Sequence, residues 1–230
     1  MDFSIISDNI GLYLNGLVIT VELVVTALVL GLMIAVPLAL MRTSRNPFIW
    51  GPVWLFIYVF RGTPLLVQLY VIYYGFGQFA AVRESFLWPY LKEAYVCALI
   101  AFALNTAAYT AEILRGAIEA TFHGEVEAAK ACGMSRSMML RRIILPSAFR
   151  RALPAYSNEV IFMLHGSAIA SVITILDITG VARLINSRFY SPYEAFIAAA
   201  LFYMALTFLI VWGFKLWEKR WHAHLHPRQQ

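Results

Sequence analysis

The sequence predicts an all-α integral membrane protein, a bundle of five transmembrane helices, and three observations support this prediction. The chain is 61% hydrophobic and only 13% charged, about half the charged fraction of an ordinary soluble domain. Its apolar segments are continuous, without the alternation expected of half-buried strands. Lipid cannot satisfy exposed backbone polar groups, so long apolar segments of this kind favour helices. We expect a single transmembrane domain over residues 1–230.

Five apolar segments are the expected spans: residues 16–40, 52–77, 94–114, 152–176 and 196–214. Each is long enough, at about 1.5 Å per residue, to cross a hydrocarbon layer of about 30 Å. No Lys or Arg precedes the first segment, which is also longer than a signal-peptide core, so we expect it to remain as an anchor. In the second segment, Gly62, Thr63 and Pro64 favour a broken helix, because proline lacks a backbone N–H.

The positions of the basic residues predict an outside N-terminus and an inside C-terminus. In that orientation thirteen Lys and Arg residues face the cytoplasm and only four face outward, as the positive-inside rule requires. The cytoplasmic set is Arg42, Arg45, Arg115, Lys130, Arg136, Arg141, Arg142, Arg150, Arg151, Lys215, Lys219, Arg220 and Arg228. This bias accounts for the net charge of +5 without a nucleic-acid partner.

The polar segment of residues 116–151 is then a cytoplasmic connection, longer than a compact helical bundle needs. Glu125 and Glu127 come early in it and basic residues come later, an order that suits the dipole of a helix. Small residues, among them Ala128 and Ala129, allow another protein surface to approach closely, and the nearby methionines are adaptable contacts. Composition alone favours a docking helix and an amphipathic helix on the membrane surface equally.

The spacing of seven residues in this segment resembles the EAA signature of ABC importer permeases. The matching positions are Glu127, Ala128, Ala129, Gly133, Ile143, Leu145 and Pro146. The stretches FRGTPLLVQLYVIYYG, ALNTAAYTAEILRGAI and LPAYSNEVIFMLHGSAIAS also resemble the polar amino-acid subfamily of type I importers, particularly its M-type permeases. The resemblance extends over about residues 10–220. Phe122 and the pair His165-Gly166 depart from the pattern common in that family.

The resemblance implies a multi-pass permease of the bacterial inner membrane, with a cytoplasmic coupling helix. It implies a homologous Q-type permease partner, two cytoplasmic ATP-binding subunits that hold ATP and Mg, and a periplasmic amino-acid-binding protein. The expected cargo is a basic amino acid, such as histidine, arginine, lysine or ornithine, or a related opine. We expect no enzymatic activity and no cofactor in this chain, which lacks a G-x-x-x-x-G-K-[ST] phosphate-binding loop.

Ionisable residues inside the predicted spans are candidates for function, because a charge in hydrocarbon is costly. Arg61 lies near the expected midplane, where it lines a translocation path or forms a structural ion pair. Asn158 and Glu159 suit a cationic substrate, and the alternative is a salt bridge from Glu159 to Arg61 or to a partner subunit. We expect Thr63, Gln68, Asn105 and Thr106 as polar neighbours of this substrate-binding site.

Two further acidic residues and the C-terminal histidines carry weaker predictions. Glu112 precedes Arg115 by three residues, which favours an ordinary ion pair on one helix face. Glu22 is expected near the outer end of the first span, where water reaches it. His222, His224 and His226 alternate as metal ligands could, but a short cytoplasmic tail is the simpler interpretation.

The sequence has three alternative functional interpretations. A permease of the same family could carry other polar amino acids. An intramembrane enzyme using Glu112, Glu159 and His165 is disfavoured, because no His-Glu-x-x-His or comparable ligand set occurs. A stand-alone channel leaves the long cytoplasmic segment without a role.

Overall fold

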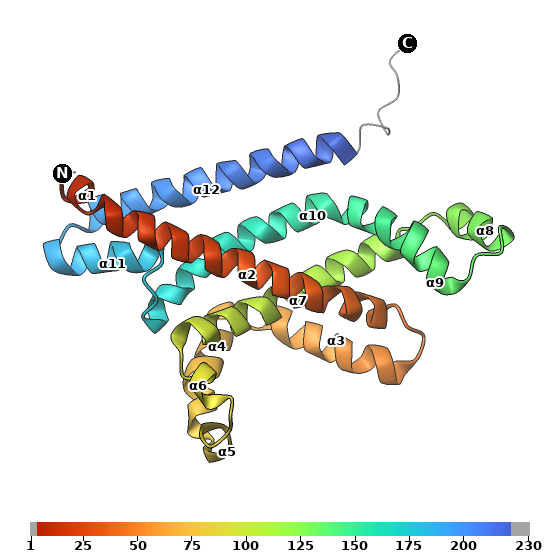
Figure 1. Ribbon diagram of the computed structural model, residues 1–230, viewed down its shortest axis with the longest axis horizontal. Coiled ribbons are helices and arrows are strands. Elements are labelled where there is room, and N and C mark those ends of the chain that lie inside the picture. The colour runs from red at the N-terminus through yellow and green to blue at the C-terminus, as the bar shows by residue number, and fades with distance from the viewer. Residues whose placement is uncertain (1–3, 222–230) are drawn as a thin grey trace, which may run out of the picture.

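The computed structural model describes residues 4–221, and all regular structure within that range is helical (Figure 1). The first half of the chain contains α1 (Ser4–Asp8), α2 (Ile10–Arg42), α3 (Pro47–Gly62), α4 (Leu65–Tyr70), a π-helical segment (Val71–Gly75), a 3₁₀ turn (Phe76–Gln78), α5 (Ala80–Arg83), α6 (Trp88–Leu91) and α7 (Ala94–Glu119). The second half contains α8 (His123–Ala131), α9 (Arg136–Met139), a π-helical segment (Leu140–Ile144), α10 (Leu145–Gly166), a 3₁₀ segment (Ser167–Ile173), α11 (Ile178–Phe189) and α12 (Pro192–Trp221).

Helices α2, α7 and α10 form the centre of the bundle. Their buried side chains include Leu23, Ala27, Phe102 and Met163, which share one apolar cluster. Gly31 lets α2 approach α7 closely: a Cβ at this position would collide with Cγ2 of Thr106 and lie 3.2 Å from the Ala103 carbonyl oxygen. Small residues at helix contacts are how membrane helices gain van der Waals contact. The α2–α7 contact is therefore the tight seam of the fold.

The predicted helical membrane architecture is confirmed, with differences in where the helices begin and bend. Helices α2, α7 and α12 are long and apolar enough to cross a bilayer, and they contain the predicted spans 16–40, 94–114 and 196–214. Two further candidates are bent pairs, residues 47–78 with a bend of 106° and residues 136–189 with a bend of 45°. Counting each bent pair as one span gives up to five.

The predicted segment of residues 116–151 overlaps the helices on either side of it. α7 continues to Glu119 and α10 begins at Leu145, so the helices extend into both ends of that range. Glu159 lies fourteen residues after the first residue of α10, about 21 Å along the helix, and Glu22 lies twelve residues after the first residue of α2.

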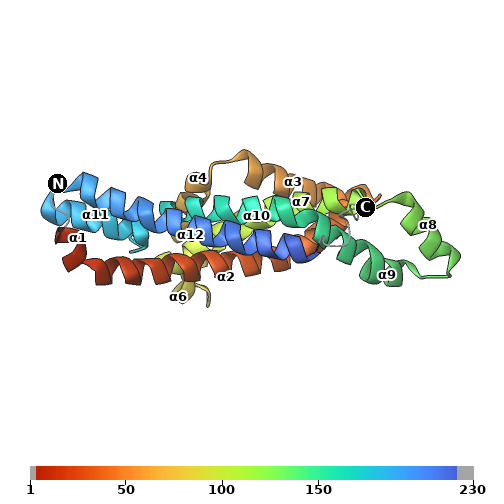
Figure 2. The same cartoon turned by 90° about the horizontal axis from the view of Figure 1, so that it is seen from above.

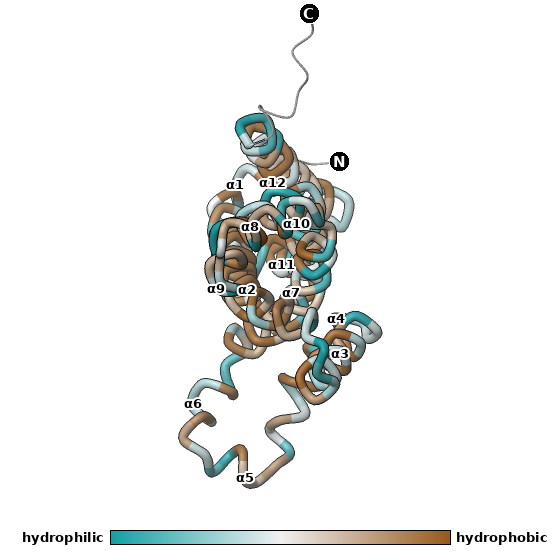
Figure 3. Tube along the Cα trace, turned by 90° about the vertical axis from the view of Figure 1, so that its right-hand side faces the viewer, coloured by the Kyte–Doolittle hydropathy of each residue, from teal (hydrophilic) through white to brown (hydrophobic). Residues whose placement is uncertain are grey.

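Two groups of short helices lie outside the bundle. The segment with α5 and α6 projects sideways, as the views in Figures 1 and 3 show. Helices α8 and α9 extend beyond the opposite end of the bundle from α11 and the first helices (Figure 2). The His222–His226 prediction lies outside the described residues.

Helix α11 was not predicted as a separate element, and a buried carboxylate defines its start. Asp177 accepts a 2.7 Å hydrogen bond from the Gly180 N–H, as an N-cap residue does. Its second oxygen accepts from the Tyr203 hydroxyl on α12 at 3.2 Å. The Ile178 N–H donates to Thr20 of α2 at 3.1 Å. The turn that begins α11 is therefore hydrogen-bonded to both α2 and α12.

We predict that Gly31→Ala destabilises the protein, because the added methyl group enters the α2–α7 seam. Overpacking of this kind typically costs about 1–3 kcal/mol. Gly51→Ala on α3 is the matched control, since a Cβ there meets no atom within 4 Å. Thermal unfolding of the purified protein in detergent measures both variants. Equal midpoints for Gly31→Ala and Gly51→Ala would contradict the close packing.

Candidate functional site

The break between α3 and α4 arises from a local sequence feature, Thr63 followed by Pro64. Proline disfavours the helical conformation of the residue before it and provides no N–H. Thr63 and Pro64 are accordingly extended, with ψ angles of 144° and 136°. The break leaves carbonyl groups of α3 without helical partners. Within a membrane such groups need another partner from the protein.

Gln68 is the main partner of these groups. Its Nε2 lies 2.8 Å from the Phe60 carbonyl oxygen, 3.1 Å from the Thr63 carbonyl oxygen and 2.8 Å from the Thr63 hydroxyl. Its Oε1 accepts a 3.0 Å hydrogen bond from Nδ2 of Asn105 on α7. Three of the predicted substrate neighbours, Thr63, Gln68 and Asn105, therefore hold the broken helix and attach it to α7.

Glu159 lies on the buried side of α10, next to this network. Its side chain is 6% exposed, and one carboxylate oxygen accepts a 2.8 Å hydrogen bond from the Thr106 hydroxyl. Among residues 4–221, no cation forms an ion pair with it. A buried carboxylate without a cation is costly, which makes it a candidate for binding a positive charge.

A cavity of about 340 Å³ opens beside the carboxylate. It is lined by Leu65, Asn105, Tyr109, Glu159, Phe162 and Met163. The lining combines one acidic group and one amide with apolar and aromatic surface. This composition suits a small ligand that carries a positive charge on an apolar stem.

Arg61 lies in a different cavity. Its guanidinium carbon is 5.1 Å from the ring centroid of Tyr109, within the range of a cation–π contact. The Tyr109 hydroxyl lies 3.5 Å from the Arg61 carbonyl oxygen. The second cavity, of about 400 Å³, is lined by Arg42, Trp54, Ile57, Tyr58, Arg61, Gly62, Tyr109 and Glu112. The expected alternative of an Arg61–Glu159 salt bridge is not formed.

Tyr109 lines both cavities and was missed by the sequence analysis. The available signal was its spacing: Tyr109 follows Asn105 by four residues, which places both on one face of α7. Arg61 lies at the end of α3, and the tertiary structure places the Tyr109 ring between Arg61 and Glu159.

Acidic and basic residues close the other end of the second cavity. Arg42 Nε lies 3.5 Å from Glu112, and Glu112 pairs with Arg115 at 2.8 Å. Arg115 also bonds to Glu119 at 2.5 Å. The predicted Glu112–Arg115 pair is confirmed, within a larger network than expected.

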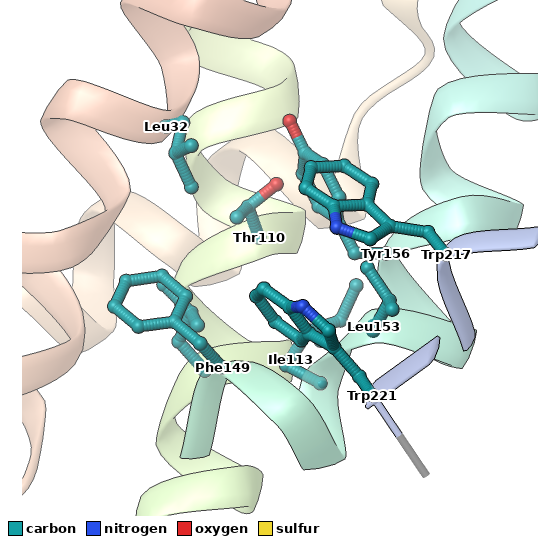
Figure 4. A pocket seen from close by; sticks show the side chains of 10 residues that line it. Leu32, Thr110, Ile113, Phe149, Leu153, Tyr156, Trp217 and Trp221 are labelled. Atoms are coloured by element: carbon teal, nitrogen blue, oxygen red, sulfur yellow. The ribbon is translucent and has the colours of Figure 1, made fainter. Parts of the chain in front are cut away.

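One predicted site residue and one further cavity lie apart from these two cavities. Asn158 is exposed on α10 and does not line the cavity beside Glu159. A third cavity, between α2, α7, α10 and α12, is lined almost entirely by apolar side chains (Figure 4). It presents no charged group to an ionic ligand.

The EAA-like signature begins on α8 and ends at the start of α10. Glu127 and Ala128 are exposed on α8, and Ala129 is buried. Gly133 has a φ of +72°. Its N–H bonds to the Lys130 carbonyl at 2.9 Å and the Met134 N–H bonds to the Ala129 carbonyl at 3.1 Å, the pattern of a Schellman motif.

The signature therefore includes the end of α8, which the turn at Gly133 defines, and the start of α10 at Leu145. Ile143 lies in the π-helical segment before α10, and Leu145 and Pro146 begin α10. Proline suits the first turn of a helix, where its missing N–H costs nothing. The exposed small residues of α8 leave its outer surface open at the tip of the molecule (Figure 2).

Comparison with known proteins agrees with this geometry. The octopine transport system permease protein of Rhizobium radiobacter is 50% identical over 205 residues, which cover 89% of this chain and 84% of the relative. The histidine/lysine/arginine/ornithine transport system permease protein of Escherichia coli (strain K12) is 46% identical over 94% of this chain and 92% of its own length.

Solved structures show the same fold. A chain from an amino acid ABC transporter crystallised with histidines has a TM-score of 0.85 at 37% identity, covering 96% of this chain and 99% of that one. A chain of an inward-facing methionine ABC transporter has a TM-score of 0.78 at 15% identity, which supports the fold alone.

Residues 14–223 match the family of binding-protein-dependent transport system inner membrane components. That range includes the two charged cavities, the broken helix and the exposed α8. The chain belongs to this family of inner-membrane transport components.

Proposed function

We propose that this chain is the permease subunit of an ATP-driven importer for basic amino acids or opines, and that Glu159 recognises the positive charge of the substrate. The observation that carries this proposal is a buried carboxylate that faces a cavity without a cation of its own. The names of the relatives, which mention octopine and four basic amino acids, agree with a cationic cargo.

The two cavities together suit both charged ends of an amino acid. Glu159 offers a counter-charge to an ammonium or guanidinium group, with Thr106 and Asn105 beside it. Arg61 offers a counter-charge to a carboxylate, since guanidinium groups match carboxylate geometry. Tyr109 stands between them, and its ring can stack on the stem or on the guanidinium of the substrate.

The broken helix also supports a partner permease. Arg61, Gly62, Thr63 and Asn158 are exposed in the isolated chain. Open backbone and charge at membrane depth are tolerated where protein or a water-filled cavity covers them. A homologous Q-type subunit on this face would supply that cover and complete a translocation path between the two permeases.

The cytoplasmic segment supports coupling to a separate ATPase. We propose that α8, with Glu127, Ala128, Ala129 and Gly133, docks on one of two ATP-binding subunits, which hold ATP and Mg. On this proposal the N-terminus lies outside, five spans cross the membrane, and a periplasmic binding protein delivers the substrate. This chain itself then catalyses no reaction.

We predict that Glu159→Gln weakens the uptake of arginine, lysine and histidine. A hydrogen bond to a charged group contributes about 1.5–3 kcal/mol, which corresponds to about a 10- to 100-fold loss of affinity. Uptake and substrate-stimulated ATP hydrolysis are measured for the assembled complex in proteoliposomes. Glu84→Gln makes the same chemical change at an exposed position and should leave both unchanged. Unchanged affinity and preference in Glu159→Gln would remove the assignment.

The position of Tyr109 predicts that its ring, more than its hydroxyl, is needed for transport. Tyr109→Phe keeps the face that Arg61 covers, whereas Tyr109→Ala merges the two cavities. A cation–π contact contributes about 0.5–2 kcal/mol, so uptake in Tyr109→Ala should fall by about 2- to 30-fold. Tyr109→Phe should transport nearly as well as the unmodified protein. Equal losses in both variants would indicate that the hydroxyl is the essential group.

The docking proposal predicts that bulk at Gly133 blocks assembly with the ATPase. Alanine and leucine pay the same backbone cost at a φ of +72°, and neither Cβ meets any atom of this chain within 4 Å. The two variants therefore differ mainly in what they present to a partner. We expect Gly133→Leu to lose co-purification of the ATPase and Gly133→Ala to keep most of it. Normal assembly and transport in Gly133→Leu would contradict the docking surface.

A further inference from the structure

The apolar cavity beneath α12 has no role in the proposed transport path. Its volume is about 130 Å³, and it is lined by Leu32, Thr110, Ile113, Leu114, Phe149, Ala152, Leu153, Tyr156, Trp217 and Trp221. Cavities of similar size lined by apolar side chains stay dry and bind small apolar molecules. The lining therefore selects hydrocarbon over water and over charged ligands.

The cavity lies where the second half of α12 diverges from α2. In Figure 1, α12 and α2 diverge toward the C-terminal end of α12. Trp217 and Trp221 reach back from α12 and cover the space, as Figure 4 shows. Their rings are in contact, with centroids 5.5 Å apart. The side chains of Trp217 and Trp221 on α12 therefore cover the cavity, and close packing of helices does not fill it.

The medium around α12 supplies a suitable occupant. α12 is one of the helices able to span a bilayer, and only 17% of its most apolar window is buried within the chain. Most of this window is therefore left uncovered by the chain, so that in a bilayer hydrocarbon would surround α12 next to the cavity. An acyl chain regains the dispersion contacts that an empty cavity forfeits.

The inner end of α12 also carries charge that complements a lipid headgroup. Lys215, Lys219 and Arg220 are exposed there, within two helical turns of Trp217 and Trp221. Arg150 is exposed near the start of α10, one residue after Phe149 of the cavity lining. Basic residues next to a membrane helix attract anionic phosphates.

A second feature of the lining is the hydroxyl of Thr110. Thr110 is 1% exposed, and its Oγ1 has no hydrogen-bond partner among the described residues. It lies one helical turn after Thr106, the partner of Glu159, and Tyr156 lies three residues before Glu159 on α10. The cavity therefore begins one turn from the charged site, on the same two helices.

We propose that this cavity binds one acyl chain of a phospholipid, whose phosphate lies among the basic residues at the end of α12. The lipid fills the space under Trp217 and Trp221 and supports the part of α10 that carries Glu159. The inference depends on the membrane setting of α12 and not on which substrate is carried.

The test is photo-crosslinking with a defined lipid. The purified complex is placed in bilayer discs that contain phosphatidylethanolamine with a diazirine within one acyl chain. After illumination, labelled peptides are mapped by mass spectrometry. We expect labels on cavity residues such as Phe149 and Leu153, in addition to labels on the exposed residues Phe208 and Leu209 of α12.

Filling the cavity provides the matched comparison. Thr110→Leu and Ala152→Leu each occupy part of the space, and either should reduce the cavity labels severalfold while the labels on Phe208 and Leu209 persist. The exchange of Lys219 and Arg220 for Gln, which leaves the cavity itself intact, should reduce cavity labelling less at high salt than at low salt. Labels confined to the outer face of α12 in the unmodified protein would overturn the proposal. So would cavity labels that both filled variants retain in full.

Discussion

The structure depends on how one break in a membrane helix is satisfied. Pro64 ends α3, and in hydrocarbon the carbonyl groups freed by that break would carry a large cost. Gln68 and Asn105 supply the missing hydrogen bonds from inside the chain. The break can therefore persist at membrane depth. It fixes the 106° bend, which leaves Arg61 at the end of α3 and against Tyr109.

Thr106 contributes both to the packing of the helices and to the geometry of the site. Its methyl group faces the space that Gly31 leaves open on α2, and its hydroxyl donates to Glu159 on α10. Since a β-branched side chain has few rotamers in a helix, one contact constrains the other. A residue that the sequence suggests only as a polar neighbour thus joins three helices. The carboxylate is held by the same contacts that build the core.

Helix α10 connects the separate parts of the molecule. It begins with Leu145 and Pro146 of the cytoplasmic signature, borders the apolar cavity with Leu153 and Tyr156, and carries Glu159. The π-helical segment before it contacts α8, α9 and α10. π-helical turns are rare and often accompany functional sites. On the proposed function, a shift of α8 on its partner reaches the substrate carboxylate through the π-helical segment and α10.

The sequence by itself determined the membrane class, the approximate spans in α2, α7 and α12, the break at Pro64 and the signature around α8. These follow from local composition and fixed spacing, which act within a few residues of chain. Only the tertiary structure separated Glu159 from exposed Asn158, placed Arg61 on Tyr109 in place of Glu159, and divided the charged groups between two cavities. The start of α11 at Asp177 likewise depends on Thr20 and Tyr203, which are distant in the chain. Such contacts depend on the angles and separations at which helices pack, and no local pattern of residues specifies those.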